Sequence, residues 1–131
     1  MEEEQRQFQD IMDVSHETIH KLTIYKERLT DWNKKINLIS ESTLPHIWRR
    51  HFLDSAQLIS FIPAGTKILA DVGAGAGFPG LVLAILAQDK GLPFFVHAIE
   101  ATGKKADFLG AVVDELKLGA RVRRERAETI K

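Results

Sequence analysis

The chain has 131 residues, no cysteine, 44% hydrophobic residues, and 18 basic side chains balanced by 18 acidic ones. This is the composition of one soluble globular domain, and it excludes collagen, disordered chains, disulfide-stapled modules and thiolate zinc sites. The apolar stretches are too short to span a membrane, and the acidic residues 2–4 differ from a basic targeting presequence. We therefore expect a cytoplasmic protein that does not enter a membrane.

The zero net charge hides opposite charges at the two ends of the chain. Residues 1–20 hold six acids and one arginine, whereas residues 121–131 hold five bases and two acids. A polyanion would approach the later part of the chain, although such a run of charges is also typical of a solvated face.

The first sixty residues are predicted to be helical, because apolar side chains recur three or four positions apart. One helix face contains Leu22, Tyr25, Leu29, Trp32 and Ile36. Residues 37–42 then break the period.

A second helix is expected to begin at Thr43 or Leu44, with Pro45 in its first turn, where the missing N–H is tolerated. Its buried face would contain Ile47, Phe52, Ala56 and Ile59. A Pro-Ala-Gly sequence at residues 63–65 ends this unit. We therefore predict a helical N-terminal domain over residues 1–62.

After residue 65 the pattern changes to alternating strands and helices. Residues 67–72 and 94–99 are β-type runs, a largely apolar helix begins at Leu81, a second helix is expected over residues 104–116, and a more polar strand over residues 121–124. This alternation predicts parallel pairing in the doubly wound α/β class. Residues 63–131 would then form part of a Rossmann-like domain, with strand order 3-2-1 and the first strand as an open apolar edge.

Residues 73–80 (GAGAGFPG) place four glycines at the junction between the first strand and its helix. Glycine permits the positive φ of a tight turn and lets a ligand approach the backbone, and a helix N-terminus adds N–H donors. A tight turn needs glycine even without a ligand. Four glycines within eight residues are more than such a turn requires, and this favours a binding loop.

Two acidic residues bear on which ligand the loop binds. The spacing of the glycines fits nucleotide-binding Rossmann domains, but Asp71, two positions before Gly73, would repel a pyrophosphate and suit the ammonium group of S-adenosylmethionine. Glu100, which closes the second strand, stands where an acid accepts hydrogen bonds from ribose hydroxyls. The alternative interpretations are a helix or turn cap for Asp71 and a helix N-terminal acid for Glu100.

Five motifs follow one another along the chain: WNKKINL at residues 32–38, RHFLDS at 50–55, DVGAGAGFPG at 71–80, Lys104-Lys105 with Phe108-Leu109, and RAE at 126–128. In this order and spacing they resemble the bacterial small-subunit ribosomal RNA guanine-N7 methyltransferase family, formerly called glucose-inhibited division protein B. The likeness runs from about Lys21 to the last residue.

The resemblance implies a Rossmann-like S-adenosylmethionine-dependent methyltransferase fold and transfer of a methyl group to N7 of guanine 527, in the 530 loop of 16S ribosomal RNA. The partner would be this RNA or the small ribosomal subunit, and we expect a monomer. The resemblance implies cofactor contacts at Gly73, Gly75, Gly77, Phe78, Glu100, Ala127 and Glu128. With Asp71, which the charge argument adds, these residues form the expected cofactor site.

Guanine N7 carries a lone pair and no proton, so its methylation requires positioning and no general base. We therefore name no catalytic base. His51, Asp54 and Ser55 match the family's helix motif, and we expect His51 to be a buried hydrogen-bonding core residue. His16 and His20 lie one helical turn apart without a third ligand, so we predict exposed side chains and no metal.

Basic side chains are candidate contacts to RNA phosphates, with surface solubility as the alternative. They are Arg49, Arg50, Lys104, Lys105, Arg121, Arg123 and Arg124. Two other functions remain open: a module that binds S-adenosylmethionine without turnover, and, less favoured because it leaves Asp71 unexplained, an NAD-dependent enzyme. A complete domain of this class continues with a fourth strand beside the first.

Overall fold

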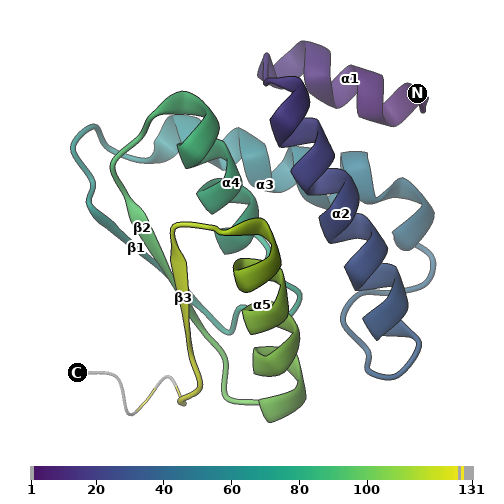
Figure 1. Ribbon diagram of the computed structural model, residues 1–131, viewed down its shortest axis with the longest axis vertical. Helices are drawn as coiled ribbons and strands as arrows, with labels where there is room; N and C mark the ends of the chain where they lie inside the picture. The colour runs from purple at the N-terminus through teal and green to yellow at the C-terminus, as the bar shows by residue number, and fades with distance from the viewer. Residues whose placement is uncertain (1, 127, 129–131) are drawn as a thin grey trace.

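The computed structural model describes residues 2–126 and 128. Helices cover one face of a small parallel sheet (Figure 1). In chain order the elements are α1 (Glu3–Met12), α2 (His16–Asn33), η1 (Leu44–His46), η2 (Trp48–Leu53), α3 (Asp54–Ala56), η3 (Gln57–Phe61), β1 (Ile68–Val72), α4 (Gly80–Lys90), β2 (Phe95–Ile99), α5 (Gly103–Leu116) and β3 (Ala120–Arg123).

Helix α2 confirms most of the first predicted helix face. Leu22, Tyr25 and Leu29 are fully buried. The placement of Ile36 on this face is wrong, because α2 ends at Asn33. The side chain of Asn33 accepts hydrogen bonds from the N–H groups of residues 38 and 39, at 2.9 and 3.1 Å, and this turns the chain away from the helix axis.

The predicted second helix is a run of four helical segments of different pitch, η1, η2, α3 and η3. Pro45 lies in the first turn, as expected. Ile47, Phe52 and Ala56 are fully buried, whereas Ile59 is only partly buried. The buried residues of this run lie at 47–48, 52 and 55–56, and the π turn of η2 spans Trp48 to Leu53.

The sheet confirms the predicted topology. Its order is β1-β2-β3 and both pairs are parallel, with Ile68 beside Phe95 and Val96 beside Ala120. The boundaries of the three strands and of α5 each differ by one residue from the predicted ones. Helix α4 is buried from Gly80 to Ala87 on all sides, because it lies between the sheet and the N-terminal helices (Figure 1).

Strand β1 is an edge, with β2 as its one neighbour in the described part of the chain. Ile68 and Val72 are 66% and 54% exposed, so the open apolar edge that the sequence predicts is confirmed. A groove of about 240 Å³ runs beside this edge under η3 and is lined in part by Phe61, Leu69 and Leu83.

One continuous cluster of buried side chains extends from Phe8 in α1 to Ala120 in β3. It joins the N-terminal helices to the helices on the sheet, and four aromatic rings meet in it: Tyr25, Phe52, Phe78 and Phe108. The predicted domain boundary after residue 62 falls between η3 and β1 and stays a prediction. No helix in the described residues is long and apolar enough to cross a membrane.

Candidate cofactor-binding site

The glycine turn lies at the carboxyl edge of the sheet. The N–H groups of Gly73 and Ala74 both donate to the carbonyl oxygen of Ile99, at 2.8 and 3.1 Å, and the N–H of Glu100 donates to Arg123 at 2.9 Å. The ends of all three strands therefore meet at one place. Open α/β sheets bind their ligands at this edge.

Two of the four glycines leave the outer side of the turn open. Gly73 and Gly75 have φ values of +72° and +53°, which side-chain-bearing residues rarely adopt. A Cβ on Gly73 would meet nothing within 4 Å, and one on Gly75 only the Gly73 carbonyl oxygen at 3.9 Å. A ligand can therefore approach the backbone at these two positions.

The other two glycines make room for the protein's own side chains. A Cβ on Gly77 would overlap the hydroxyl oxygen of Tyr25, and one on Gly80 would lie 2.7 Å from Oδ2 of Asp71. Gly77 therefore faces the core, and only Gly73 and Gly75 of the predicted glycine cradle have an open side. The sequence did not indicate this division, because Tyr25 is distant along the chain.

Asp71 caps helix α4. Its Oδ2 accepts a hydrogen bond of 2.9 Å from the N–H of Gly80, the first residue of that helix, so the alternative interpretation as a cap is what the structure displays. Its Oδ1 has no hydrogen-bond partner among the described residues and is not fully buried. Burial raises the pKa of Asp71, the Gly80 N–H opposes this rise, and the nearby Glu100 adds to it.

Glu100 joins the glycine turn to the start of α5. Its Oε1 accepts from the N–H of Gly75 at 2.8 Å and its Oε2 from the N–H of Thr102 at 3.0 Å. Burial alone would raise the pKa of Glu100, but these N–H groups and the charge of Lys105 outweigh it and hold the pKa below its ordinary value. The carboxylate is therefore ionised at neutral pH, and each oxygen can accept a second hydrogen bond.

Phe78 lies between two other rings. Tyr25 stacks on it at 5.6 Å and 20° between planes, and His51 at 4.8 Å and 10°. His51 is half-buried, which corrects the expectation of a buried core residue, and its Nε2 lies 2.9 Å from Oγ1 of Thr43. Burial lowers the pKa of His51 although Asp54 opposes this, so the ring is neutral at pH 7.

The ring of His51 forms one wall of a shallow groove of about 240 Å³ next to the glycine turn. Its lining mixes charged and aromatic side chains: Arg50, His51, Asp54, Ser55, Leu58, Phe78 and Pro79. The RHFLDS motif therefore lies beside the turn in space, although the two are far apart in the sequence.

The basic side chains that the sequence singled out come from several elements. Arg49 and Arg50 are exposed on η2, and Arg121 is exposed on β3. Arg123 forms an ion pair with Glu125 at 3.1 Å. The guanidinium of Arg124 covers Gly103, where a Cβ would lie 2.5 Å from its Nη2, and the neighbouring residues 104 and 105 bring two lysines to the same end of α5.

The remaining predicted site residues are Ala127 and Glu128, and the two histidines that the sequence placed outside any site lie on α2. Ala127 lies outside the described residues, and Glu128 is exposed, with an ion-pair distance of 3.8 Å to Arg126. His16 and His20 are exposed, as expected. In residues 2–126 and 128 no group of three or more His, Asp or Glu side chains is placed to hold a metal ion.

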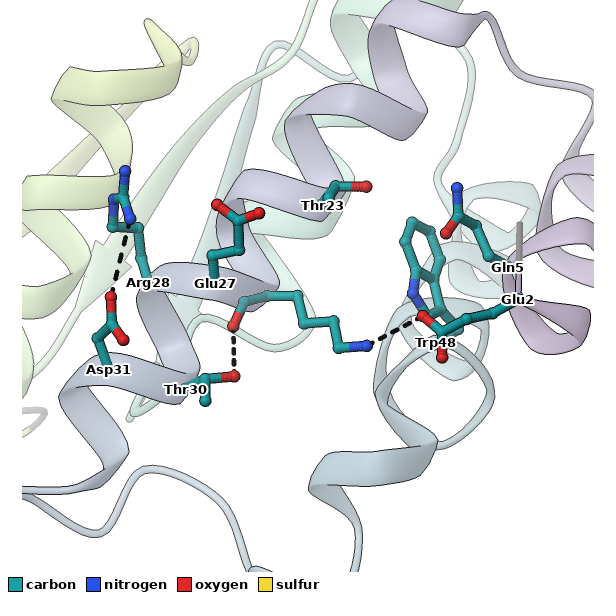
Figure 2. A pocket seen from close by; sticks show the side chains of 9 residues that line it. Glu2, Gln5, Thr23, Glu27, Arg28, Thr30, Asp31 and Trp48 are labelled. Atoms are coloured by element: carbon teal, nitrogen blue, oxygen red, sulfur yellow. Dashed lines mark hydrogen bonds and ion pairs between the residues drawn. The ribbon is translucent and has the colours of Figure 1, made fainter.

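A hollow of about 430 Å³ lies away from the glycine turn, between α2, the start of α1 and η2 (Figure 2). Both signs of charge line it: Lys26 pairs with Glu2 at 3.1 Å, and Arg28 lies 3.8 Å from Asp31. None of the motif residues at the sheet edge contributes to it. Size alone therefore does not mark the site in this chain.

A family model described as rRNA small subunit methyltransferase G matches residues 18–131. The chain belongs to the rRNA small subunit methyltransferase G family. This membership confirms the resemblance drawn from the five motifs and agrees with the Rossmann-like α/β fold.

Relatives named ribosomal RNA small subunit methyltransferase G have high identity to the chain. The protein of Rhodospirillum centenum is 50% identical over 121 residues, which are 92% of this chain and 54% of that protein. The protein of Rhodospirillum rubrum is 53% identical over 96 residues, 73% of this chain and 45% of that protein. For Cereibacter sphaeroides the values are 42% over 119 residues, 91% and 58%. The chain thus spans about half the length of the curated relatives it matches.

Proposed function

We propose that this chain carries the cofactor-binding part of an S-adenosylmethionine-dependent methyltransferase that modifies N7 of guanine 527 in 16S ribosomal RNA. The methyltransferase family and the names of its members support rRNA methylation. The choice of S-adenosylmethionine and of guanine N7 rests on the glycine turn, on its two acidic neighbours and on the family resemblance.

The observation that carries the cofactor assignment is the open glycine turn with two carboxylates that accept from its backbone, Glu100 at Gly75 and Asp71 at Gly80. Oδ1 of Asp71 is free among the described residues, and Glu100 is ionised and bonded to the Gly75 N–H. The carboxylate of Asp71 would repel the pyrophosphate of NAD, whereas it attracts the ammonium group of S-adenosylmethionine. Glu100 suits the ribose of either cofactor. In this proposal Asp71 binds the ammonium group and Glu100 accepts from ribose hydroxyls.

In this proposal the protein accelerates methyl transfer by holding guanine N7 in line with the methyl group of the cofactor. S-adenosylmethionine supplies the methyl group, and guanine N7 attacks it without losing a proton, so no side chain has to act as a base. Gly73 and Gly75 admit the cofactor, and Phe78 borders both the turn and the neighbouring groove. The neutral His51 and the exposed Arg50 would face the RNA there.

The RNA side of the proposal uses the exposed basic residues on two sides of the turn. Arg49 and Arg50 on η2 and Lys104 on α5 are open to phosphates. At Arg123, a phosphate would compete with the ion pair to Glu125. The partner would be 16S ribosomal RNA or the small ribosomal subunit, in the cytoplasm.

Binding of S-adenosylmethionine without turnover is the second candidate function. The edge of β1, unpaired in the described residues, favours it, because the substrate crevice of this fold class is completed beside that strand. The two candidates share the cofactor and differ in methyl transfer.

Thermal shift measurements test the cofactor assignment. We expect S-adenosylhomocysteine to raise the melting temperature of the chain and NAD to leave it unchanged, because binding to the folded state alone stabilises that state. A shift with NAD and none with S-adenosylhomocysteine would refute the assignment.

A further inference from the structure

The glycine turn is held from its inner side by one residue of the N-terminal helices. Tyr25, in the middle of α2, is fully buried, and its hydroxyl donates a hydrogen bond of 2.5 Å to the carbonyl oxygen of Ala76. A Cβ on the next residue, Gly77, would overlap that hydroxyl. The Tyr25 hydroxyl therefore fills the space that the missing side chain of Gly77 leaves.

The ring of Tyr25 holds the next residue of the turn. It stacks on Phe78 at 5.6 Å, and its other ring contacts are to Phe52 at 5.6 Å and Phe108 at 6.3 Å. Three consecutive residues, 76 to 78, are thus fixed by one side chain through a hydrogen bond, a close approach and a ring stack. Such contacts restrict the turn to one conformation.

Tyr25 differs from the other side chains that hydrogen-bond the backbone of the turn. In the described part of the chain these are Asp71 and Glu100, and both are proposed to meet the cofactor. Tyr25 contacts the turn at residues 76–78, whereas the glycines with an open side are Gly73 and Gly75, so we expect ligand binding to leave its contact intact.

The hydroxyl of Tyr25 acts as a donor throughout the physiological pH range. Burial, and secondly the charge of Asp71, raise the pKa of Tyr25 well above its ordinary value of 10.0. The proton therefore stays on the oxygen, and the hydrogen bond to the Ala76 carbonyl does not depend on pH.

We propose that Tyr25 is a positioning residue of the cofactor site, which fixes the glycine turn in its binding shape before the cofactor arrives. The N-terminal helices then belong to the cofactor site itself, in addition to any part they have in RNA binding. Preorganisation of this kind strengthens binding because less ordering is left for the ligand to impose. The inference rests on the proposed function, since it takes S-adenosylmethionine as the ligand.

Tyr25→Phe tests the proposal, because it keeps the ring and removes the hydroxyl. At a temperature where the variant is folded, we expect its affinity for S-adenosylhomocysteine in calorimetry to fall about tenfold. We also expect amide hydrogen exchange within residues 73–80 to become faster, while exchange in β2 is unchanged. The exchange measurement needs no ligand.

Thr18→Val is the matched control. Thr18 is also a buried hydroxyl residue of α2, and its hydroxyl bonds to Asp89 at 2.6 Å, at the far end of α4 from the turn. This variant removes one partly buried hydrogen bond between α2 and α4, so its melting temperature falls. Its affinity for S-adenosylhomocysteine and the exchange of residues 73–80 stay those of the wild type.

A second variant tests the contact itself. Gly77→Ala places a methyl group against the Tyr25 hydroxyl, so it lowers the melting temperature more in the wild-type background than in Tyr25→Phe. Equal losses in both backgrounds, or unchanged exchange and affinity in Tyr25→Phe, would overturn the proposal. A wild-type chain that does not bind S-adenosylhomocysteine would refute the proposed function, and exchange would still decide whether Tyr25 holds the turn.

Discussion

Replacing Asp71 by asparagine separates two tasks that this side chain combines. Oδ2 of Asp71 caps α4 through the Gly80 N–H at 2.9 Å, and Oδ1 has no partner among the described residues. Asparagine still offers an acceptor oxygen to Gly80 but carries no charge. A pure cap would therefore tolerate Asp71→Asn, whereas an ammonium-binding carboxylate would not.

The size of the effect on binding follows from the electrostatics of the site. Two opposite unit charges about 4 Å apart attract each other by about 4 kcal/mol at an effective dielectric constant of about 20. Part of this attraction is offset by removing water from both groups. We expect Asp71→Asn to weaken binding of S-adenosylhomocysteine by at least tenfold, which corresponds to about 1.4 kcal/mol.

The effect on the empty protein has the opposite sign. Burial raises the pKa of Asp71 in the folded state, and the Gly80 N–H offsets part of that rise. A group with a raised folded-state pKa stabilises the fold below its unfolded pKa, and this contribution is lost as the pH rises through the folded pKa. At neutral pH the ionised carboxylate is therefore unfavourable, and the ligand-free Asp71→Asn variant should melt at the same temperature or higher.

Isothermal titration calorimetry and thermal melting at pH 7 measure the two effects. Asp89→Asn is the control: Asp89 accepts hydrogen bonds from Ser15 and Thr18, which outweigh the effect of its burial and lower its pKa. That variant should lose melting temperature and keep wild-type affinity. Unchanged affinity in Asp71→Asn would show that the carboxylate only caps the helix, and would refute the electrostatic argument.

Three further predictions concern the same site. Gly75→Val should abolish S-adenosylhomocysteine binding in calorimetry, because φ is +53° there, and intact affinity would remove the turn from the site. The N–H groups of Thr102 and Gly75 hold the pKa of Glu100 low despite its burial, so the stability this carboxylate adds is lost as the pH falls through its folded pKa. The urea midpoint of Glu100→Gln should therefore change less than that of the wild type between about pH 7 and pH 3, and equal changes would contradict this. Methyl transfer to 16S ribosomal RNA by the purified chain alone should be absent, because β1 has no strand on its outer side in the part of the chain that the structure describes. Turnover would show that a further strand beside β1 is not needed.

The order of helices and strands could be predicted from short-range patterns in the sequence. The apolar period of α2, the β-type runs and the glycine-rich junction each depend on residues that are near one another in the chain. They predict the parallel sheet and its exposed edge at Ile68 and Val72 correctly. They fail at Ile36, because α2 ends at Asn33, and they do not predict that the helical run over residues 44–61 divides into 3-10, π and α segments.

The candidate site also has one part that the sequence predicts and one part that only the fold shows. The sequence by itself determined that a glycine turn with Asp71 and Glu100 stands at the ends of two strands, because strand ends and glycine density are local properties. Only the tertiary structure decided which glycines face open space and which face Tyr25 or Asp71. The physical reason is that steric overlap at Gly77 involves a side chain that the fold, and not the chain order, brings within contact distance.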